Sequence, residues 1–353
     1  MNIFDTLKNQ HLNQLPFVVF CKPNSDRIVG VFQRTSSLFS WENGTESGFA
    51  FVSFDGKQKY YFPVQECNVV VDQRHPSDFY VAQEVALSYD ENAKIAFEQL
   101  VEIGLNAIQN NQFQKVVLSR KELVTVHNFN LEAVFNQLVN SYPSAFNYCL
   151  YHPKIGLWMG ATPEQFIKIE GNKLQTVSLA GTQLFDSELE WGTKERQEQQ
   201  LVTDFISENL QLFSENVTIS EPKTVKAGNL AHLKSDISAV IDKKNLGQTI
   251  NSLHPTPAVC GLPKESSQQF IVENEGYNRE FYAGFLGELN IDFTSYKTEN
   301  SDLFVNLRCM KVEGKLANVF VGCGITKDSQ PEKEFLETVN KSVTIKKVLN
   351  NGI

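Results

Sequence analysis

The chain has 353 residues, of which 41% are hydrophobic and 21% are charged, and its formal net charge is −9. This balance argues against a nucleic-acid partner, because binding to a phosphate backbone needs clustered lysines and arginines. No apolar stretch approaches the roughly 20 residues of a membrane span. The first residues, MNIFDTLKNQHLNQ, lack the basic and apolar regions of a signal peptide, so we expect a cytoplasmic protein without a membrane partner.

The sequence indicates one large domain over residues 1–353, because no Pro/Ser-rich linker, charge block or low-complexity run divides it. Residues 1–85 are expected to form a less regular N-terminal part of this domain. The six cysteines show no C-x-x-C spacing, which is typical of reduced, buried thiols rather than of a metal or disulfide framework.

The predicted elements begin with a helix over residues 91–110, where apolar residues recur at helical period. A β-rich run (115–126) and a second helix (131–142) follow. The runs FNYCLYH and IGLWMG read as strands, and FIKIEGNKLQTVSLAGT reads as a hairpin that turns at Gly171–Asn172. These segments predict a helix–strand mixture in which neighbouring strands form hairpins.

The second half of the chain continues this pattern. We expect a long helix over 186–213, then strands and a short helix through 217–253. Three strands are predicted, over 281–292, 302–312 and 315–326, and a last helix over 331–349, which Pro331 suits as its first residue. Because strict βαβ alternation is missing, the elements indicate an α+β architecture rather than a doubly wound parallel sheet.

Two Glu-x-x-Glu pairs, Glu195–Glu198 and Glu334–Glu337, fall in two of these predicted helices. The i, i+3 spacing puts both carboxylates of a pair on one helix face. If the helices meet, four carboxylates converge, and such a cluster repels itself unless it holds a hard cation such as Mg²⁺. The alternative for each pair is a solvated helix face, which is where such pairs usually lie.

Lys115 and Glu164 are candidates for acid–base chemistry. Lys115 opens the apolar strand QKVVLSR, where it is either an ordinary snorkelling lysine or a base made neutral by desolvation or a nearby cation. Glu164 follows a strand and a tight turn in GATPEQF, where it either flanks the turn or serves as a buried, protonated general acid.

Arg308 and Lys341 are candidate anion-binding residues. Arg308 lies among apolar residues on the predicted strand FVNLRCM, so its partner is either a substrate carboxylate or an internal salt bridge. Lys341 follows Glu337 by four residues and lies on the same helix face, where a simple Glu–Lys pair is the alternative role.

Glycines and one histidine complete the candidates. SLAGT offers the Gly181 N–H and the Thr182 hydroxyl, and VGCGIT offers Gly322 and Gly324 without the third glycine of a dinucleotide fingerprint. His232, in AHLKSDI, is either a polar site residue or a satisfied core histidine, and from the residues alone we favour the core interpretation.

Ten segments taken in order resemble the chorismate-utilising enzymes, and the resemblance runs from about residue 90 to the C-terminus. The segments are KVVLSR, GATPEQF, SLAGT, KERQEQQ, HLKSDI, LHPTPAVCGLP, REFYAGFLGE, VNLRCM, VGCGIT and EFLETVNK. The resemblance implies that residues 90–350 form the catalytic core of a single α+β domain, with a large antiparallel β-sandwich flanked by helices. It also implies chorismate as a small-molecule substrate.

Within this family the segments look most like isochorismate synthases. Anthranilate synthases usually lack a lysine at the place of Lys115, and aminodeoxychorismate synthases carry a nucleophilic lysine at the place of Ala180. LHPTPAVCG has the isochorismate-synthase form, from which salicylate synthases usually differ. The alternatives are therefore a salicylate synthase, which adds pyruvate elimination, and the large chain of an amidotransferase-dependent synthase. We expect a monomer with no obligatory amidotransferase partner.

The resemblance also implies roles for individual residues. By motif, Lys115 matches the general base and Glu164 the general acid. Mg²⁺ is the implied cofactor, with Glu198 and Glu337 as direct ligands and Glu195 and Glu334 bound through water. The implied substrate contacts are Gly181, Thr182, Tyr282, Arg308, Gly322 and Lys341, with His232 beside them.

Two positions depart from the family pattern. Gln199 stands where the family often has a histidine after the metal-binding glutamate, so the surroundings of Glu198 must differ from those in relatives. Val259 replaces a commoner leucine in the HPTPA loop.

Overall fold

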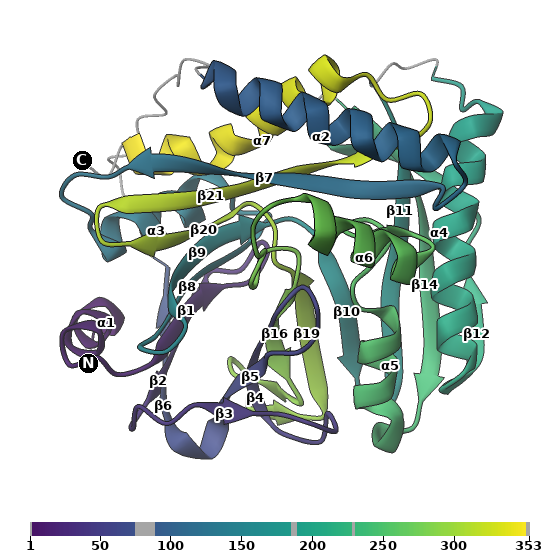
Figure 1. The fold of residues 1–353 in the computed structure, drawn as a ribbon. Helices are drawn as coiled ribbons and strands as arrows, with labels where there is room; N and C mark the ends of the chain where they lie inside the picture. Colours follow the sequence, from purple (N-terminus) through teal and green to yellow (C-terminus); the bar gives the residue numbers. More distant parts are fainter. Residues whose placement is uncertain (1, 75–88, 185–188, 228–229, 351–353) are drawn as a thin grey trace.

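The protein is described by a computed structural model, which covers residues 2–74, 89–184, 189–227 and 230–350. Two large antiparallel sheets and a two-stranded ribbon form a single domain (Figure 1). Within the described ranges, no helix is long and apolar enough to cross a membrane.

The nine-stranded sheet joins the N-terminal part of the chain to the segments that carry the candidate base. Its strands, in spatial order, are β15 (Gly261–Leu262), β7 (Lys115–Thr125), β21 (Leu316–Ile325), β20 (Cys309–Glu313), β9 (Gly156–Thr162), β8 (Phe146–His152), β1 (Phe17–Cys21), β2 (Arg27–Gln33) and β6 (Cys67–Gln73).

The ten-stranded sheet carries the remaining long strands. In order these are β12 (Ser214–Ile219), β14 (Leu230–Ile241), β11 (Lys173–Leu184), β10 (Gln165–Glu170), β19 (Asn300–Val305), β16 (Phe285–Leu289), β4 (Gly48–Val52), β5 (Lys59–Pro63) and β3 (Phe39–Ser40), with β13 (Lys223–Ala227) paired to β14. β17 (Ile291–Asp292) and β18 (Lys297–Thr298) form the ribbon.

Helices lie against both sheets. They are α1 (Ile3–Leu12), α2 (Glu91–Gln109), α3 (Leu131–Ser141), α4 (Thr193–Gln211), α5 (Leu246–Leu253), α6 (Lys264–Asn274) and α7 (Pro331–Asn350), with 3-10 turns at Val64–Glu66 and Lys243–Asn245. Side-chain caps begin several of them, as at Asp90, which accepts the N–H groups of Asn92 and Ala93. α2 and α7 lie side by side over β7 and β21, whereas α4 packs across β11 and β14 (Figure 1).

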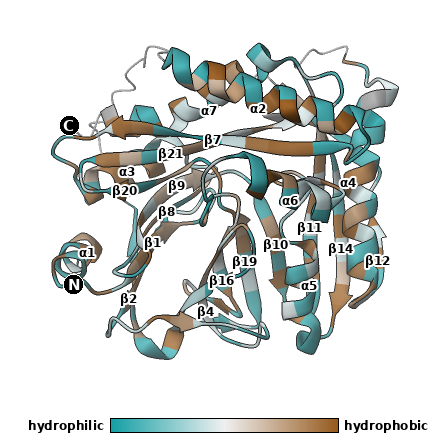
Figure 2. Ribbon diagram, in the orientation of Figure 1, coloured by the Kyte–Doolittle hydropathy of each residue, from teal (hydrophilic) through white to brown (hydrophobic). Residues whose placement is uncertain are grey.

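An aromatic core joins the two sheets. Phe146 of β8 stacks on Phe304 of β19 with 4.5 Å between ring centroids, and Phe20 of β1 stacks on Phe146 at 5.4 Å. Such rings bury a large apolar area, so they supply much of the stabilisation of the sandwich. Figure 2 shows hydrophilic and hydrophobic residues alternating around α2 and α7, as expected of helices with one buried face.

The predicted fold class, an antiparallel β-sandwich core flanked by helices, is confirmed. The N-terminal part is more regular than predicted, because residues 17–73 supply strands to both sheets. Part of the expected helix over 186–213 lies outside the described residues, and α4 begins at Thr193. All six cysteines are buried and free, as predicted.

The prediction of one strand over 302–312 is wrong. β19 belongs to the ten-stranded sheet and β20 to the nine-stranded sheet, so the chain changes sheets between Val305 and Cys309. Asn306 fixes this crossing: its side-chain amide donates to Phe281 O at 2.9 Å, and its oxygen accepts from the Tyr148 hydroxyl at 2.7 Å. A buried, hydrogen-bonded asparagine inside an apolar run gives no periodic signal, so the sequence pattern hid the break.

Candidate active site

β7 and β21 place Lys115 beside a glycine. Lys115 is the first residue of β7, and Gly324 lies on the neighbouring strand β21. A Cβ added at Gly324 would lie 3.1 Å from Lys115 Cε, so the glycine leaves room for the lysine side chain. Lys115 Nζ donates to Glu198 Oε1 at 2.9 Å, and its side chain is only 14% exposed. Lys115 is therefore a largely buried lysine paired with a predicted metal ligand.

Glu164 lies in the short link between β9 and β10. Its carbonyl accepts from Val305 N at 2.9 Å, which ties the link to the end of β19. The residue is partly exposed, but the surrounding protein desolvates the carboxyl and raises the pKa of Glu164 to about 7, against the opposing effects of Lys115, Lys341 and Arg308. A carboxyl with this pKa can carry a proton near neutral pH, as the general-acid interpretation needs.

Arg308 lies at the crossing between the sheets, with a positive φ of 47°. Its Nη1 donates to Lys341 O and to Thr344 Oγ1, both at 3.4 Å, and burial lowers the pKa of Arg308. Among the described residues, no carboxylate lies within ion-pair distance of the guanidinium. Arg308 therefore does not lie within the predicted strand FVNLRCM, because the chain changes sheets here.

Lys341, Gly322 and Tyr282 meet beneath α7. Lys341 Nζ donates to Gly322 O at 2.9 Å and to Glu337 Oε1 at 2.6 Å. A Cβ at Gly322 would lie 2.9 Å from the Tyr282 hydroxyl oxygen, so only glycine lets this tyrosine approach β21. The Tyr282 ring stacks on Phe320 at 5.4 Å, and burial raises the pKa of Tyr282, which keeps its hydroxyl protonated.

His232 and Gly181 lie on the paired strands β14 and β11. His232 Nδ1 is 3.2 Å from Gly181 O, and burial lowers the pKa of His232, which favours the neutral ring. Gly181 has a φ of +70°, and a Cβ there would lie 3.1 Å from Glu195 Cβ. His232 therefore lies against a predicted site residue, although we favoured a core role for it. The Thr182 side chain lies outside the described residues.

The two Glu pairs lie on α4 and α7 as predicted, and the second glutamate of each pair contacts a lysine. Glu198 contacts Lys115 and Glu337 contacts Lys341. Burial raises the pKa of Glu334, and the neighbouring Glu337 adds to this rise. In the described part of the chain, no three His, Cys, Asp or Glu side chains come close enough to hold a metal ion. The predicted convergence of four carboxylates is thus not seen, although their oxygen donors suit Mg²⁺ by chemistry.

Gln199 has a structural role that the sequence did not reveal. Its buried amide nitrogen donates to Ser178 Oγ at 3.1 Å, Ser235 Oγ at 2.9 Å and Thr203 Oγ1 at 2.9 Å. The amide therefore joins α4 to both β11 and β14, directly beside Glu198. Val259, the other departure, is buried, and its carbonyl accepts from Arg279 Nη1 at 2.9 Å.

A buried ion pair between Glu275 and Arg279 contacts β7, and it too was not predicted from the sequence. Glu275 Oε1 accepts from Ser119 N at 2.7 Å and pairs with Arg279 Nη2 at 2.5 Å. Arg279 Nη2 also donates to Val117 O at 2.6 Å. Charged residues in the segment 275–279 could have suggested such a pair, but nothing in the sequence identified β7 as its partner.

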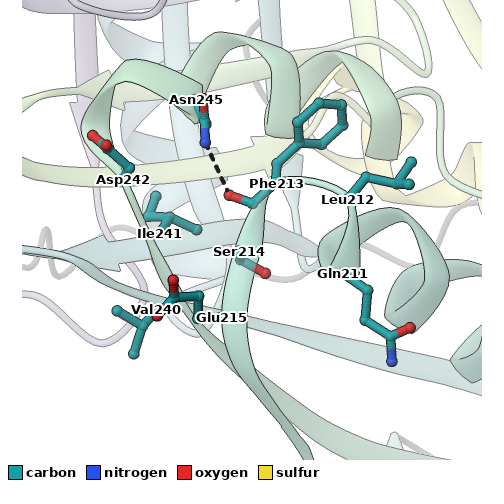
Figure 3. A pocket seen from close by; sticks show the side chains of 9 residues that line it. All are labelled: Gln211, Leu212, Phe213, Ser214, Glu215, Val240, Ile241, Asp242 and Asn245. Atoms are coloured by element: carbon teal, nitrogen blue, oxygen red, sulfur yellow. Dashed lines mark hydrogen bonds between the residues drawn. The ribbon is translucent and has the colours of Figure 1, made fainter.

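Two cavities lie away from these residues. One, of about 480 Å³, lies at the C-terminal end of α4 and is lined by residues 211–215, 240–242 and Asn245 (Figure 3). Another, of about 690 Å³, lies between α6 and the segment around Phe54. Neither is lined by a predicted site residue, so we place the candidate site around Lys115, Glu164, Arg308 and Lys341.

Comparisons with known proteins identify the family of the chain. A family model described as "Chorismate binding enzyme" matches residues 64–350. The chain is 27% identical over 267 residues to "Isochorismate synthase MenF" of Escherichia coli (strain K12), which covers 72% of this chain and 60% of that protein. It is 29% identical over 267 residues to "Anthranilate synthase component 1" of Thermococcus kodakarensis, covering 72% of this chain and 60% of that protein. The chain thus matches only about 60% of the length of either relative.

The fold also matches a solved structure. The crystal structure of the putative 2,3-dihydroxybenzoate-specific isochorismate synthase DhbC from Bacillus anthracis superposes with a TM-score of 0.76 at 19% identity. The superposition covers 99% of this chain and 100% of that one. At this identity the match supports the fold alone.

Proposed function

This chain belongs to the chorismate-binding enzyme family, and we propose that within it the protein is an isochorismate synthase. The observation that carries the proposal is that a largely buried lysine, Lys115, lies near a carboxyl, Glu164, whose pKa is raised by desolvation to about 7. Lys115 comes from β7 and Glu164 from the link between the two sheets, so base and acid can approach a ring from different sides. Sequence identity does not decide the activity, because an anthranilate synthase component matches as well as an isochorismate synthase.

The proposed reaction exchanges one ring hydroxyl of chorismate for another. Lys115 accepts a proton from a water molecule, whose oxygen forms a bond to C2. The ring double bonds shift, the C4–O bond breaks, and protonated Glu164 gives its proton to the departing hydroxyl, which leaves as water. One water is consumed and one is released, so the step is an isomerisation that needs no redox cofactor.

Lys115 must leave its ion pair before it can act as a base. In the structure Lys115 Nζ donates a hydrogen bond to Glu198 Oε1 at 2.9 Å, so its nitrogen is directed at that carboxylate rather than at a water molecule. Although no three such side chains converge in the described structure, we propose that Glu198 and Glu337 directly, and Glu195 and Glu334 through water, would hold Mg²⁺, which would withdraw electron density from the ring carboxylate of the substrate. Arg308 has no carboxylate partner among the described residues, so its guanidinium can bind a substrate carboxylate through two parallel hydrogen bonds.

Two related activities are the main alternatives. A salicylate synthase adds loss of pyruvate to the same isomerisation, and an amidotransferase-dependent synthase uses ammonia in place of water. Ala180 has no nucleophile to offer, and Lys115 favours water as the attacking group. We therefore propose that the protein acts without an amidotransferase partner and as a monomer.

Product identification distinguishes these activities. The protein is incubated with chorismate and Mg²⁺, with and without ammonium, and the products are separated by chromatography. We expect isochorismate in both incubations and no pyruvate. Salicylate with pyruvate, or an amino-substituted product that appears only with ammonium, would contradict the proposal.

A further inference from the structure

We propose that Arg120 and Glu122 form a clamp that fixes the position of α7 along β7, and that Arg120 is thereby a positioning residue for Glu337 and Lys341. This inference deepens the proposed function and rests on it where turnover is measured. Arg120 and Glu122 lie on the same strand as Lys115, but Arg120 faces α7.

The clamp contacts α7 at two points. Arg120 Nε donates to Thr338 Oγ1 at 2.7 Å, and the guanidinium lies over the Phe335 ring with 5.0 Å to its centroid. Arg120 Nη1 donates to Glu122 Oε2 at 3.2 Å, and the other oxygen of Glu122 pairs with Lys346. Thr338 and Lys346 are eight residues apart, so the two contacts lie about 12 Å apart along the helix axis.

The position of α7 matters because the helix carries one predicted site residue between the two contacts and another directly before the first. Lys341 lies between Thr338 and Lys346, and Glu337 directly precedes Thr338. Lys341 Nζ reaches Gly322 O at 2.9 Å, a contact that a small slide of the helix would break. The apolar side of α7, including fully buried Phe335, attracts the helix to the sheet without specifying direction. Directional hydrogen bonds are therefore needed to select one register.

Arg120 is not well suited to a purely stabilising role. The residue is only 9% exposed, and its Nη2 is buried with no hydrogen-bond partner in the described structure. A buried charged group with an unmade hydrogen bond costs stability, and well-packed apolar residues often replace such groups without loss. If Arg120 served only to stabilise the fold, a well-packed apolar side chain at this position would serve as well or better.

Two matched hydroxyls of α7 distinguish an effect on the position of the helix from a general effect on the stability of the fold. Thr338 and Ser342 are both fully buried, and each hydroxyl donates to the carbonyl three residues earlier. Only Thr338 also accepts from Arg120. Thr338→Val and Ser342→Ala each remove a hydroxyl, but only Thr338→Val breaks the clamp, and Thr338→Ser restores the oxygen. Arg120→Met removes the charge and keeps a side chain that can pack on Phe335.

Hydrogen exchange of the α7 amides and chorismate kinetics are measured on these four variants of the full chain. In Arg120→Met and Thr338→Val we expect faster exchange at residues 334–341, by about tenfold, because local opening becomes easier. We expect kcat/KM to fall roughly 10- to 100-fold, as small misplacements of site groups do, with Tm little changed. Ser342→Ala and Thr338→Ser should resemble the wild type in both measurements.

Unchanged exchange and kinetics in Arg120→Met would overturn the clamp. Equal losses in Ser342→Ala and Thr338→Val would do the same, because they would show a general effect of lost hydroxyls. If the wild type did not convert chorismate at all, the proposed function would fail, while the exchange rates of α7 would still decide the clamp.

Discussion

The two acidic helices carry the same Glu-x-x-Glu spacing but are held in different ways. α4 is joined to its strands by an uncharged network around Gln199, and its Glu198 pairs with Lys115 from another strand. α7 is joined to β7 by charged groups, and its Glu337 pairs with Lys341 of the same helix. One motif therefore occurs in two settings, and only the local pair on α7 follows from sequence spacing.

The largest expected effect on turnover comes from removing the charge of Glu198 or of Glu337. Glu198→Gln and Glu337→Gln should each abolish nearly all turnover, because a neutral amide is a poorer ligand for a hard cation than a carboxylate. The fold should survive in both, and in Glu337→Gln Lys341 can keep its bond to Gly322 O. Steady-state turnover and a thermal melt check this, and full activity of the wild type in EDTA would show that neither glutamate serves a metal.

The acid and base should give the next largest effect. Lys115→Ala and Glu164→Ala should each lower kcat by roughly 10²- to 10⁴-fold, the usual range for losing a general base or acid. Because both act in one displacement, the double variant should lose much less than the product of the single losses. Strictly multiplicative losses would indicate that Lys115 and Glu164 act in separate steps.

Arg308→Lys tests the unpaired guanidinium at the sheet crossing. A lysine cannot form the two-pronged hydrogen bond, and a half-satisfied carboxylate costs roughly 1–3 kcal/mol, or about 5- to 150-fold in kcat/KM. Tm should change little, because the Arg308 guanidinium makes only two long hydrogen bonds to the described residues, both at 3.4 Å and both to α7. A destabilised variant with normal kinetics would instead identify Arg308 as a structural residue.

The pH dependence of kcat should follow the protonation of the Glu164 carboxyl. Its pKa is raised from 4.5 to about 7, so the protonated acid is lost as pH rises through 7, and kcat should fall about tenfold per pH unit above that value. A raised pKa in the folded state also means that the stability contribution of Glu164 is present below pH 4.5 and is lost as pH rises through 7. Burial also raises the pKa of Glu288 to about 7, so Glu288 changes the stability over the same pH range.

Glu164→Gln isolates the contribution of Glu164 from that of Glu288. The variant should be more stable than the wild type above pH 7, by on the order of 1–3 kcal/mol, and equally stable near pH 4. Urea unfolding at several pH values measures the difference. A difference in unfolding free energy that does not change with pH would show that the pKa of Glu164 is not raised in the folded state.

Gln199→Leu should have the smallest effect on kinetics. The change removes the amide that joins α4 to Ser178 and Ser235, so we expect a loss of roughly 1–3 kcal/mol in unfolding free energy from hydroxyls left without this partner. Glu198 remains on its helix, so kcat should stay within about threefold of the wild type. A large kinetic loss at unchanged stability would show that Gln199 acts on Glu198 directly.

The sequence predicted the parts of the site that local patterns determine. Helical spacing placed both glutamates of each pair on one helix, and the Glu337–Lys341 pair followed from its four-residue separation. The contact between Lys115 and Glu198 joins residues 83 positions apart, and only the resemblance to a known family brought them together. The roles of Gln199 and Arg120 depend on partners from distant elements, and so does the change of sheet before Arg308. No periodicity reports such contacts.

The acid–base displacement is tested most directly by running the reaction in water labelled with ¹⁸O. If Lys115 activates a water molecule that attacks C2, each isochorismate molecule formed should carry one labelled oxygen in its new ring hydroxyl. Recovered chorismate serves as the control for reversal of the reaction. Isochorismate without label at C2 would mean that the original hydroxyl migrates within the substrate, and it would contradict the roles proposed for Lys115 and Glu164.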